Sequence, residues 1–253
     1  MEIFPIPAFK DNYIWTLIQG EHAVCVDPGD AAPVQAFLQQ RKLQLSALLN
    51  THHHWDHTGG NTVLINRSTI PLYGPKHEAI EGLTHKLSEG DEITLTEIGL
   101  QLRVLDIPGH TAGHIALYND DMLFCGDTLF ACGCGRLFEG TPEQMSASLE
   151  KLARLNKNTK IYCGHEYTLA NITFAKAVEP ANKNITDREK REAAKRVANQ
   201  PTLPSTIGEE LETNPFLRCA EPAVIEAAEK YAGKSLNNKI AVFAALREWK
   251  NNF

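Results

Sequence analysis

Short apolar runs separated by turn residues dominate the first two-thirds of the chain. Residues 2–9, 12–19 and 22–29 predict successive strands, because Asp-Asn, Gly-Glu and Pro-Gly pairs interrupt the apolar pattern. Residues 31–43 have the spacing of a helix, and residues 45–51 (LSALLNT) predict a buried strand. Further strands are predicted at residues 71–75, 100–108, 114–119, 122–128 and 160–166.

The pattern becomes helical in the last third of the chain. Ahead of this region, a helix is predicted at residues 141–155, where Thr-Pro and the nearby Glu143 are typical of a helix N-terminus. After about Tyr167 helical segments dominate. The sequence therefore predicts an α/β domain over residues 1–166 and a helical domain over residues 167–253. The helical segments of the second domain are residues 168–180, 186–200, 222–233 and 237–252.

The composition is that of an ordinary globular protein, with 43% apolar and 22% charged residues. No apolar run approaches the roughly 20 residues that cross a bilayer, and the N-terminus lacks a secretory pattern, so we expect a cytoplasmic protein that does not enter membranes. The net charge of −6 and the lack of a basic stripe argue against nucleic-acid binding. No obvious interface signal is present, which favours a monomer.

The six cysteines are expected to be reduced thiols. Cys132 and Cys134 could suggest a metal or redox pair. However, no second cysteine pair completes a zinc cage of the usual kind, so we expect no cysteine metal site.

A cluster of potential metal ligands follows the strand predicted at residues 45–51. Residues 51–57 (THHHWDH) place four histidines and a carboxylate where the chain leaves that strand, and His52, His54, Asp56 and His57 are the candidate ligands among them. His110, Asp127 and His165 each follow a later apolar strand and have a glycine beside them. Side chains collected from several strand ends are a common way for a rigid sheet to build a site.

Seven such ligands are too many for one tetrahedral ion and suit two ions. A single histidine at a strand end is usually structural, but this many buried imidazoles and carboxylates without a cation would leave costly unpaired groups. We expect one ion on His52, His54 and His110, a second on Asp56, His57 and His165, and Asp127 between them. Imidazole and carboxylate ligands favour zinc, with iron or manganese as alternatives.

The remaining histidines are expected to have other roles. His53 alternates outward between two ligands, and His114 is predicted to lie beside the metal site and to support it. His22, His77 and His85 are predicted to lie at the surface or in turns.

The motifs THHHWDHTGG, IPGHT, FCGDTLF and CGHEYT resemble the landmarks of the metallo-β-lactamase superfamily. The chain is similar to the hydroxyacylglutathione hydrolases, or glyoxalases II, in four longer segments. These are GDTLFACGCGRLFEGTPEQM, CGHEYTLANITFA, TLPSTIGEELETNPFLR and FAALREWKNNF. This resemblance covers nearly the whole chain. It implies a four-layer αββα sandwich with a C-terminal helical domain, and hydrolysis of S-D-lactoylglutathione to D-lactate and glutathione, the second step of methylglyoxal detoxification.

The resemblance also implies roles for particular residues. The metal positions of the family fall on the seven ligands already named, with Asp56 and Asp127 beside a hydroxide that bridges the ions. The glutathione contacts of the family fall on Arg136, Phe138, Tyr167, Arg247 and Lys250. Phe138 stands where some members have tyrosine, and Arg136 where some have lysine, which keeps the charge but changes the hydrogen bonding.

Other functions remain open at this stage. The nearest are a β-lactamase, a lactonase or a persulfide dioxygenase of the same superfamily. The full ligand set favours hydrolysis, and Arg247 and Lys250, three residues apart on one helix face, favour a glutathione substrate. A phosphodiesterase and a non-enzymatic metal sensor are further alternatives. The acidic balance argues against the first, and a sensor would need a closed site.

Overall fold

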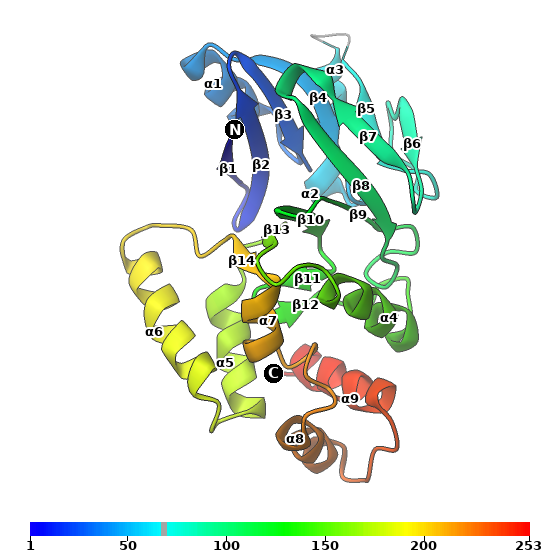
Figure 1. The fold of residues 1–253 in the computed structure, drawn as a ribbon, viewed down its shortest axis with the longest axis vertical. Helices are drawn as coiled ribbons and strands as arrows, with labels where there is room; N and C mark the ends of the chain where they lie inside the picture. Colours follow the sequence, from blue (N-terminus) through cyan, green and yellow to red (C-terminus); the bar gives the residue numbers. More distant parts are fainter. Residues whose placement is uncertain (67–69) are drawn as a thin grey trace.

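The protein is described by a computed structural model that covers residues 1–66 and 70–253. In this part of the chain two sheets of six strands lie face to face, and a group of helices lies at one end of them (Figure 1). The first sheet runs β1 (Glu2–Ala8), β2 (Asn12–Gln19), β3 (His22–Val26), β4 (Gln44–Leu49), β5 (Leu72–Pro75) and β6 (His85–Leu87). The second runs β14 (Ser205–Thr206), β13 (Lys160–Cys163), β10 (Met122–Gly126), β9 (Ile115–Tyr118), β8 (Leu100–Asp106) and β7 (Glu92–Leu95).

The two faces of the first sheet bury different sets of side chains. Successive side chains of a strand point to opposite faces. In β2, Trp15 and Leu17 therefore join the core between the sheets, whereas Ile14 joins a second core on the outer face. That outer core is covered by α1 (Ala31–Arg41) and α3 (Asn61–Ile65). Both faces of this strand are buried from Asn12 to Ile18, and most of its side chains are apolar.

The second sheet is covered on its outer side by α4 (Pro142–Ala153), whose Met145 and Leu149 join the main core. Thr141 caps this helix, and the Gln144 side chain accepts a hydrogen bond from the backbone N–H of Thr141. The four layers implied by the family resemblance are therefore present, and the predicted fold class is confirmed. Shorter elements complete the fold: α2 (Trp55–Thr58), the 3-10 helix η1 (Thr96–Ile98), and the hairpin of β11 (Leu129–Phe130) and β12 (Gly133–Cys134).

The last third of the chain is helical, as predicted, with one exception. Its helices are α5 (Thr168–Val178), α6 (Lys183–Val197), α7 (Ile207–Thr213), α8 (Pro222–Ala232) and α9 (Lys239–Asn251). Strand β14 interrupts them and pairs with β13, which returns the chain to the second sheet (Figure 1). The helix predicted from residue 186 begins earlier, at Lys183, because Asn182 caps it. Strands β6, β7, β11, β12 and β14 and the helices α2, α3 and α7 were not predicted as such.

The proposed division at residues 166 and 167 stays a prediction. Core residues from both sides of it, such as Phe124 and Phe174, belong to one continuous buried cluster. Among the described residues no helix is both long and apolar enough to span a membrane.

Candidate metal centre

The seven predicted ligands come together at the carboxyl ends of four strands. His52 and His54 follow β4, His110 follows β8, Asp127 follows β10, and His165 follows β13. Asp56 and His57 belong to the short helix α2, which begins immediately after His54. The strand ends that were inferred from the apolar pattern are therefore the positions from which this centre is built.

Three histidines form the first half of the centre. The Nδ1 atom of His54 lies 3.2 Å from the Nε2 atom of His52 and 3.0 Å from the Nε2 atom of His110. All three nitrogens lie within 4.8 Å of one another. Three imidazole nitrogens that converge on one point form a donor set suited to a zinc-like cation.

Asp56, His57 and His165 form the second half. The Oδ2 atom of Asp56 lies 3.6 Å from the Nε2 atom of His57 and 3.5 Å from the Nε2 atom of His165. Asn12 donates to the same Asp56 oxygen at 3.0 Å, which fixes the carboxylate.

Asp127 lies between the two halves. Its Oδ2 atom is 3.5 Å from the Nε2 atom of His110 in the first half and 3.2 Å from the Nε2 atom of His165 in the second. Its Oδ1 atom is 3.4 Å from the Nε2 atom of His57. One carboxylate therefore faces both groups, which is the geometry that a bridging ligand needs.

The donor set also passes a test of fit to cations. The Nε2 atom of His57 and the Oδ1 atom of Asp127 are buried and have no hydrogen-bond partner in the described part of the chain. Buried polar atoms are nearly always satisfied by a partner. Both of these atoms point into the centre, so cations held there would satisfy them.

The site electrostatics favour the ligand forms of most of these groups. Burial lowers the pKa of His52, His54 and His110, which keeps these rings neutral. Burial alone would raise the pKa of Asp127, but the neighbouring His57 and His165 outweigh it and hold that pKa well below its usual range. Neutral imidazole and ionised carboxylate are the forms that bind metal.

The other ring nitrogen of four histidines is held by a fixed oxygen. A carboxylate or carbonyl oxygen can only accept, and the Thr51 hydroxyl already donates its proton to Asp27. In the neutral, metal-binding form of each ring the Nδ1 atom therefore carries the proton, and the Nε2 lone pair faces the centre. The pairs are His57 with Asp27 (3.1 Å), His165 with Asp11 (2.9 Å), His110 with the carbonyl of Arg136 (2.9 Å) and His52 with the hydroxyl of Thr51 (3.0 Å).

Asp27 is a supporting residue that the sequence analysis missed. It adopts a left-handed backbone conformation with φ of 52°, which is uncommon for any residue except glycine. Its two oxygens accept from the backbone and the hydroxyl of Thr51 at 2.8 and 2.7 Å, and the second also faces His57. The signal in the sequence was an aspartate between the end of a buried strand and Pro-Gly, which we read only as a turn.

A glycine is required beside the centre at position 164. A Cβ atom there would lie 2.6 Å from both the Oδ1 atom of Asp127 and the Cε1 atom of His57. Residue 164 therefore has to lack a side chain for these two groups to approach each other.

The remaining histidines lie outside the two groups. His53 points away and contacts Glu78 at 3.0 Å and Glu139 at 3.3 Å. His114 is buried beside the centre and accepts from the backbone N–H of Asp127 at 3.2 Å. His77 and His85 are exposed and His22 is half-buried. All six cysteines are buried and unpaired.

Three of the predicted substrate contacts lie at the edge of the centre. The exposed Phe138 ring packs against His54 and His110, with ring centroids 5.7 and 5.2 Å apart. Tyr167 stacks on His165 at 4.7 Å. The side chain of Arg136 is exposed, while its carbonyl oxygen orients His110.

The other two predicted contacts lie on α9 and face the loop that contains Arg136. Arg247 is only 5% exposed, and its Nη1 atom donates to the carbonyls of Cys134 and Gly135 at 2.7 and 3.4 Å. The Nζ atom of Lys250 donates to the carbonyl of Ala170 at 3.1 Å. Burial and the nearby Arg247 lower the pKa of Lys250 to about 8. Arg247 is thus more enclosed than a solvated cation near a helix end would be.

Comparisons with known proteins agree with this geometry. Residues 12–165 match the metallo-beta-lactamase superfamily, and residues 166–253 match the family described as hydroxyacylglutathione hydrolase C-terminus. A hydroxyacylglutathione hydrolase of Nitrosomonas europaea is 54% identical over 100% of this chain and 97% of its own length. One from Alkalilimnicola ehrlichii is 56% identical over 99% of this chain and 98% of its own length.

Solved structures share the fold. ETHE1 from Myxococcus xanthus is 23% identical, covers 99% of this chain and 98% of its own, and superposes with a TM-score of 0.65. TTHA1623, crystallised in a di-iron-bound form, is 27% identical, covers 85% of this chain and 100% of its own, and gives a TM-score of 0.60.

Proposed function

This chain belongs to the hydroxyacylglutathione hydrolases of the metallo-beta-lactamase superfamily, and we propose that its seven converging side chains hold two metal ions for that reaction. The protein is a thioester hydrolase that converts S-(2-hydroxyacyl)glutathione to glutathione and a 2-hydroxy acid. With S-D-lactoylglutathione the products are glutathione and D-lactate, which is the second step of methylglyoxal detoxification. The position of Asp127 between the two ligand groups is the observation that carries this proposal.

The superfamily and the two ligand groups indicate a binuclear metal site, and we propose zinc as its metal. When bound, metal ions in such a site lower the pKa of water from 15.7 to about 7 and polarise a carbonyl oxygen. Imidazole-rich donor sets suit zinc, and also iron or manganese.

The protein's own residues prepare the reacting groups. The side chain of Asp127 is 10% exposed, whereas that of Asp56 is 23% exposed, so Asp56 is the more accessible carboxylate. We assign to Asp56, fixed by Asn12, the orientation of the attacking water through a hydrogen bond to its free oxygen. The thiolate of glutathione is a good leaving group, so no serine or cysteine nucleophile is needed.

Three cations are proposed to bind the glutathione part of the substrate. Arg136, Arg247 and Lys250 lie near the loop after β12. Burial, and then the charges of Arg247 and Arg136, lower the pKa of Lys250. We assign the three cations to the glycine carboxylate, since charge-assisted hydrogen bonds to a carboxylate are roughly twice as strong as neutral ones. Phe138 and Tyr167 would then border the thioester, and Phe138 offers an apolar surface without a hydroxyl.

We further propose a cytoplasmic monomer. The six cysteines are unpaired and buried, which is the state expected in a reducing compartment. The lactonase, β-lactamase and phosphodiesterase alternatives are not favoured, because relatives that align over the whole chain are thioester hydrolases.

The proposal is tested by steady-state kinetics on protein whose metal content has been counted. S-D-lactoylglutathione should be hydrolysed far faster than a β-lactam or a phosphodiester at equal concentration. The activity should follow metal content as metal is removed and returned. Equal rates on the β-lactam, or full thioesterase activity in metal-free protein, would contradict it.

A further inference from the structure

A buried ion pair joins two helices of the last third of the chain at a distance from the metal ligands. Arg188 on α6 is 2% exposed, and Glu210 on α7 is fully buried. The Nη2 atom of Arg188 lies 2.7 Å from the Oε1 atom of Glu210. Burying two charges costs about as much as their attraction returns, so such a pair is weak as a source of stability alone. We therefore expect a role of this ion pair other than stability.

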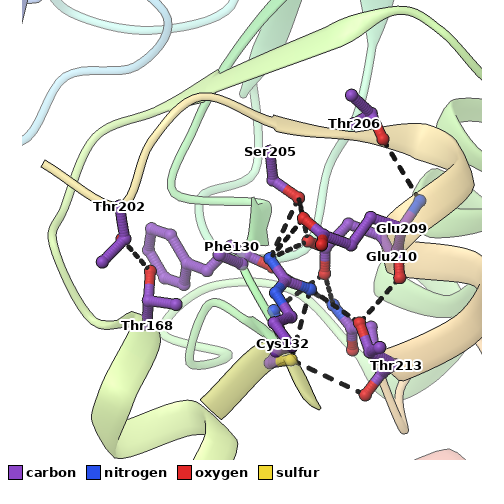
Figure 2. Close-up of polar contacts among 12 residues, drawn as sticks. Phe130, Cys132, Thr168, Thr202, Ser205, Thr206, Glu209, Glu210 and Thr213 are labelled. Carbon is purple, nitrogen blue, oxygen red and sulfur yellow. Dashed lines mark hydrogen bonds and ion pairs between the residues drawn. The ribbon is translucent and has the colours of Figure 1, made fainter. Parts of the chain in front are cut away.

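The guanidinium of Arg188 makes several further polar contacts, and Figure 2 labels their partners Ser205, Cys132 and Thr213. It donates to the hydroxyls of Thr213 at 2.6 Å and Ser205 at 3.0 Å, and it lies 3.3 Å from the Sγ atom of Cys132. The planar fork of an arginine holds five N–H donors in a fixed geometry, which the compact ammonium of a lysine does not reproduce. These contacts hold Glu210 in one orientation.

Glu210 in turn holds the β11–β12 hairpin. Its Oε2 atom accepts from the backbone N–H of Cys132 at 2.7 Å and from the side chain of Asn214 at 3.0 Å. Asn214 also donates to the carbonyls of Phe130 and Gly133, one on each strand. Cys132 occupies the turn with φ of 55°, a conformation that a residue with a side chain rarely adopts. Figure 2 shows Cys132 and Phe130 beside Glu210 and Thr213.

The two ends of this hairpin carry parts of the metal centre. Asp127 lies two residues before β11, and a Cβ atom added at Gly135, just after β12, would lie 1.9 Å from the carbonyl oxygen of Asp127. The next carbonyl, that of Arg136, accepts from His110. The carbonyl of Cys134 accepts from Arg247. A displaced hairpin would therefore move a bridging carboxylate, the orientation of His110 and the support of Arg247 together.

We propose that Arg188 and Glu210 are positioning residues for the metal centre, and that they act on Asp127 and His110 through the β11–β12 hairpin. This inference rests on the proposed metal centre. It assigns to α6 and α7 a role in metal binding, in addition to any role of the last third of the chain in binding glutathione.

The test is a Zn²⁺ titration of the full chain against a chromophoric chelator, well below the melting temperature. Glu210→Gln removes the charge but keeps the size of the side chain, and it should weaken Zn²⁺ binding by about 10- to 100-fold, as loss of an outer-shell partner typically does. The matched control is Glu179→Gln. Glu179 is 5% exposed and pairs with Arg218 at 2.8 and 2.9 Å, in the same helical region but without a contact to the hairpin among the described residues.

The control should lower the melting temperature yet keep Zn²⁺ affinity within about twofold of wild type. Unchanged affinity in folded Glu210→Gln, or an equal loss in Glu179→Gln, overturns the inference. If Glu210→Gln does not fold, Arg188→Lys replaces it, because it keeps a charge beside Glu210 but lacks the fork that reaches Thr213; the same criterion applies. Wild-type protein that binds no Zn²⁺ would instead overturn the proposed metal centre itself.

Discussion

At the scale of single residues, the carboxylate of Asp127 connects the two ligand groups. One of its oxygens faces a nitrogen from each group, and the other is buried with no hydrogen-bond partner among the described residues. An amide of the same shape could still fill the space but would present only one oxygen and no charge. Replacing Asp127 by asparagine therefore tests its role as a metal ligand without changing how the side chain packs.

Asp127→Asn should lose metal and activity together. We expect fewer than two ions per chain and a fall in kcat beyond the roughly 10–100-fold typical of residues that act through another ligand. Metal counting on the purified variant and steady-state kinetics measure both quantities. Asp120→Asn is the control, since the Asp120 side chain is 87% exposed and pairs with Arg103 at the surface. Two ions per chain at wild-type turnover in Asp127→Asn would disprove the bridging assignment.

Lys250 predicts a pH dependence of substrate binding. Its pKa, lowered to about 8 by burial and by Arg247, means that the proton is lost as the pH rises through about 8. A neutral amine gives up a charged hydrogen bond worth about 1.5–3 kcal/mol, or roughly tenfold or more in binding. The value of kcat/KM for wild type, divided by that of Lys250→Arg, should therefore fall between about pH 7 and about pH 9.5. A ratio that does not change with pH would remove Lys250 from substrate binding.

The convergence of the seven candidate ligands was predictable because histidines and aspartates at strand ends form a recognisable pattern. Their supporting partners were not. Asp11 lies 154 positions from His165, and Asp27 lies 30 positions from His57. We read Asp11 as part of a turn, and Asp27 as the end of a strand beside a Pro-Gly turn. The residue types that favour turns, such as aspartate, also accept hydrogen bonds. Only the folded structure shows which of the two roles a given aspartate has.

At the scale of elements, length decided what could be predicted. The longer strands and helices have a periodic pattern and were predicted close to their observed positions. β6 has three residues and β14 has two, so neither is long enough to show alternation. Their partners in the sheet define such strands, and pairing between distant segments leaves no local signal.

The predicted start of α4 gives a direct test of a local signal. The side chain of Thr141 accepts from the backbone of Gln144 at 3.3 Å, and Gln144 returns a bond at 3.0 Å. Thr141→Ala should destabilise the protein by about 1 kcal/mol, which lowers the melting temperature by roughly 2–4 °C. Thermal unfolding measures this. Thr173→Ala, at an exposed position inside α5, is the control and should not lower it, because alanine is the better helix former. Equal shifts in both variants would contradict the capping role.

At the scale of the whole molecule, bound metal couples the active centre to global stability. An ion that binds only the folded state adds about 2.7 kcal/mol at 100 times its dissociation constant. Chelation should therefore lower the melting temperature, and Zn²⁺ should restore it. The shift should be smaller in Asp127→Asn. Calorimetry with and without chelator measures it, and identical melting temperatures would mean that the seven side chains hold no ion in the folded protein.

The overall architecture was predictable through the family resemblance, but the order of the strands was not. Periodicity does not tell that β3 and β4 pair in parallel while β2 and β3 pair antiparallel. Nor does it show that the outer edge of the second sheet comes from a segment some forty positions beyond the end of β13. Long-range pairing is decided by the burial of whole faces, which no short window of sequence contains.

That edge has a consequence for any shortened form of the protein. β14 pairs with Lys160 and Ile161 at the start of β13, and a strand edge that lacks such a partner is a template on which another chain can align. A fragment that stopped at residue 166 would expose this apolar strand, whose Ile161 and Cys163 are fully buried in the intact chain. Such fragments should aggregate or be degraded, so a protein truncated in this region should not accumulate in folded form.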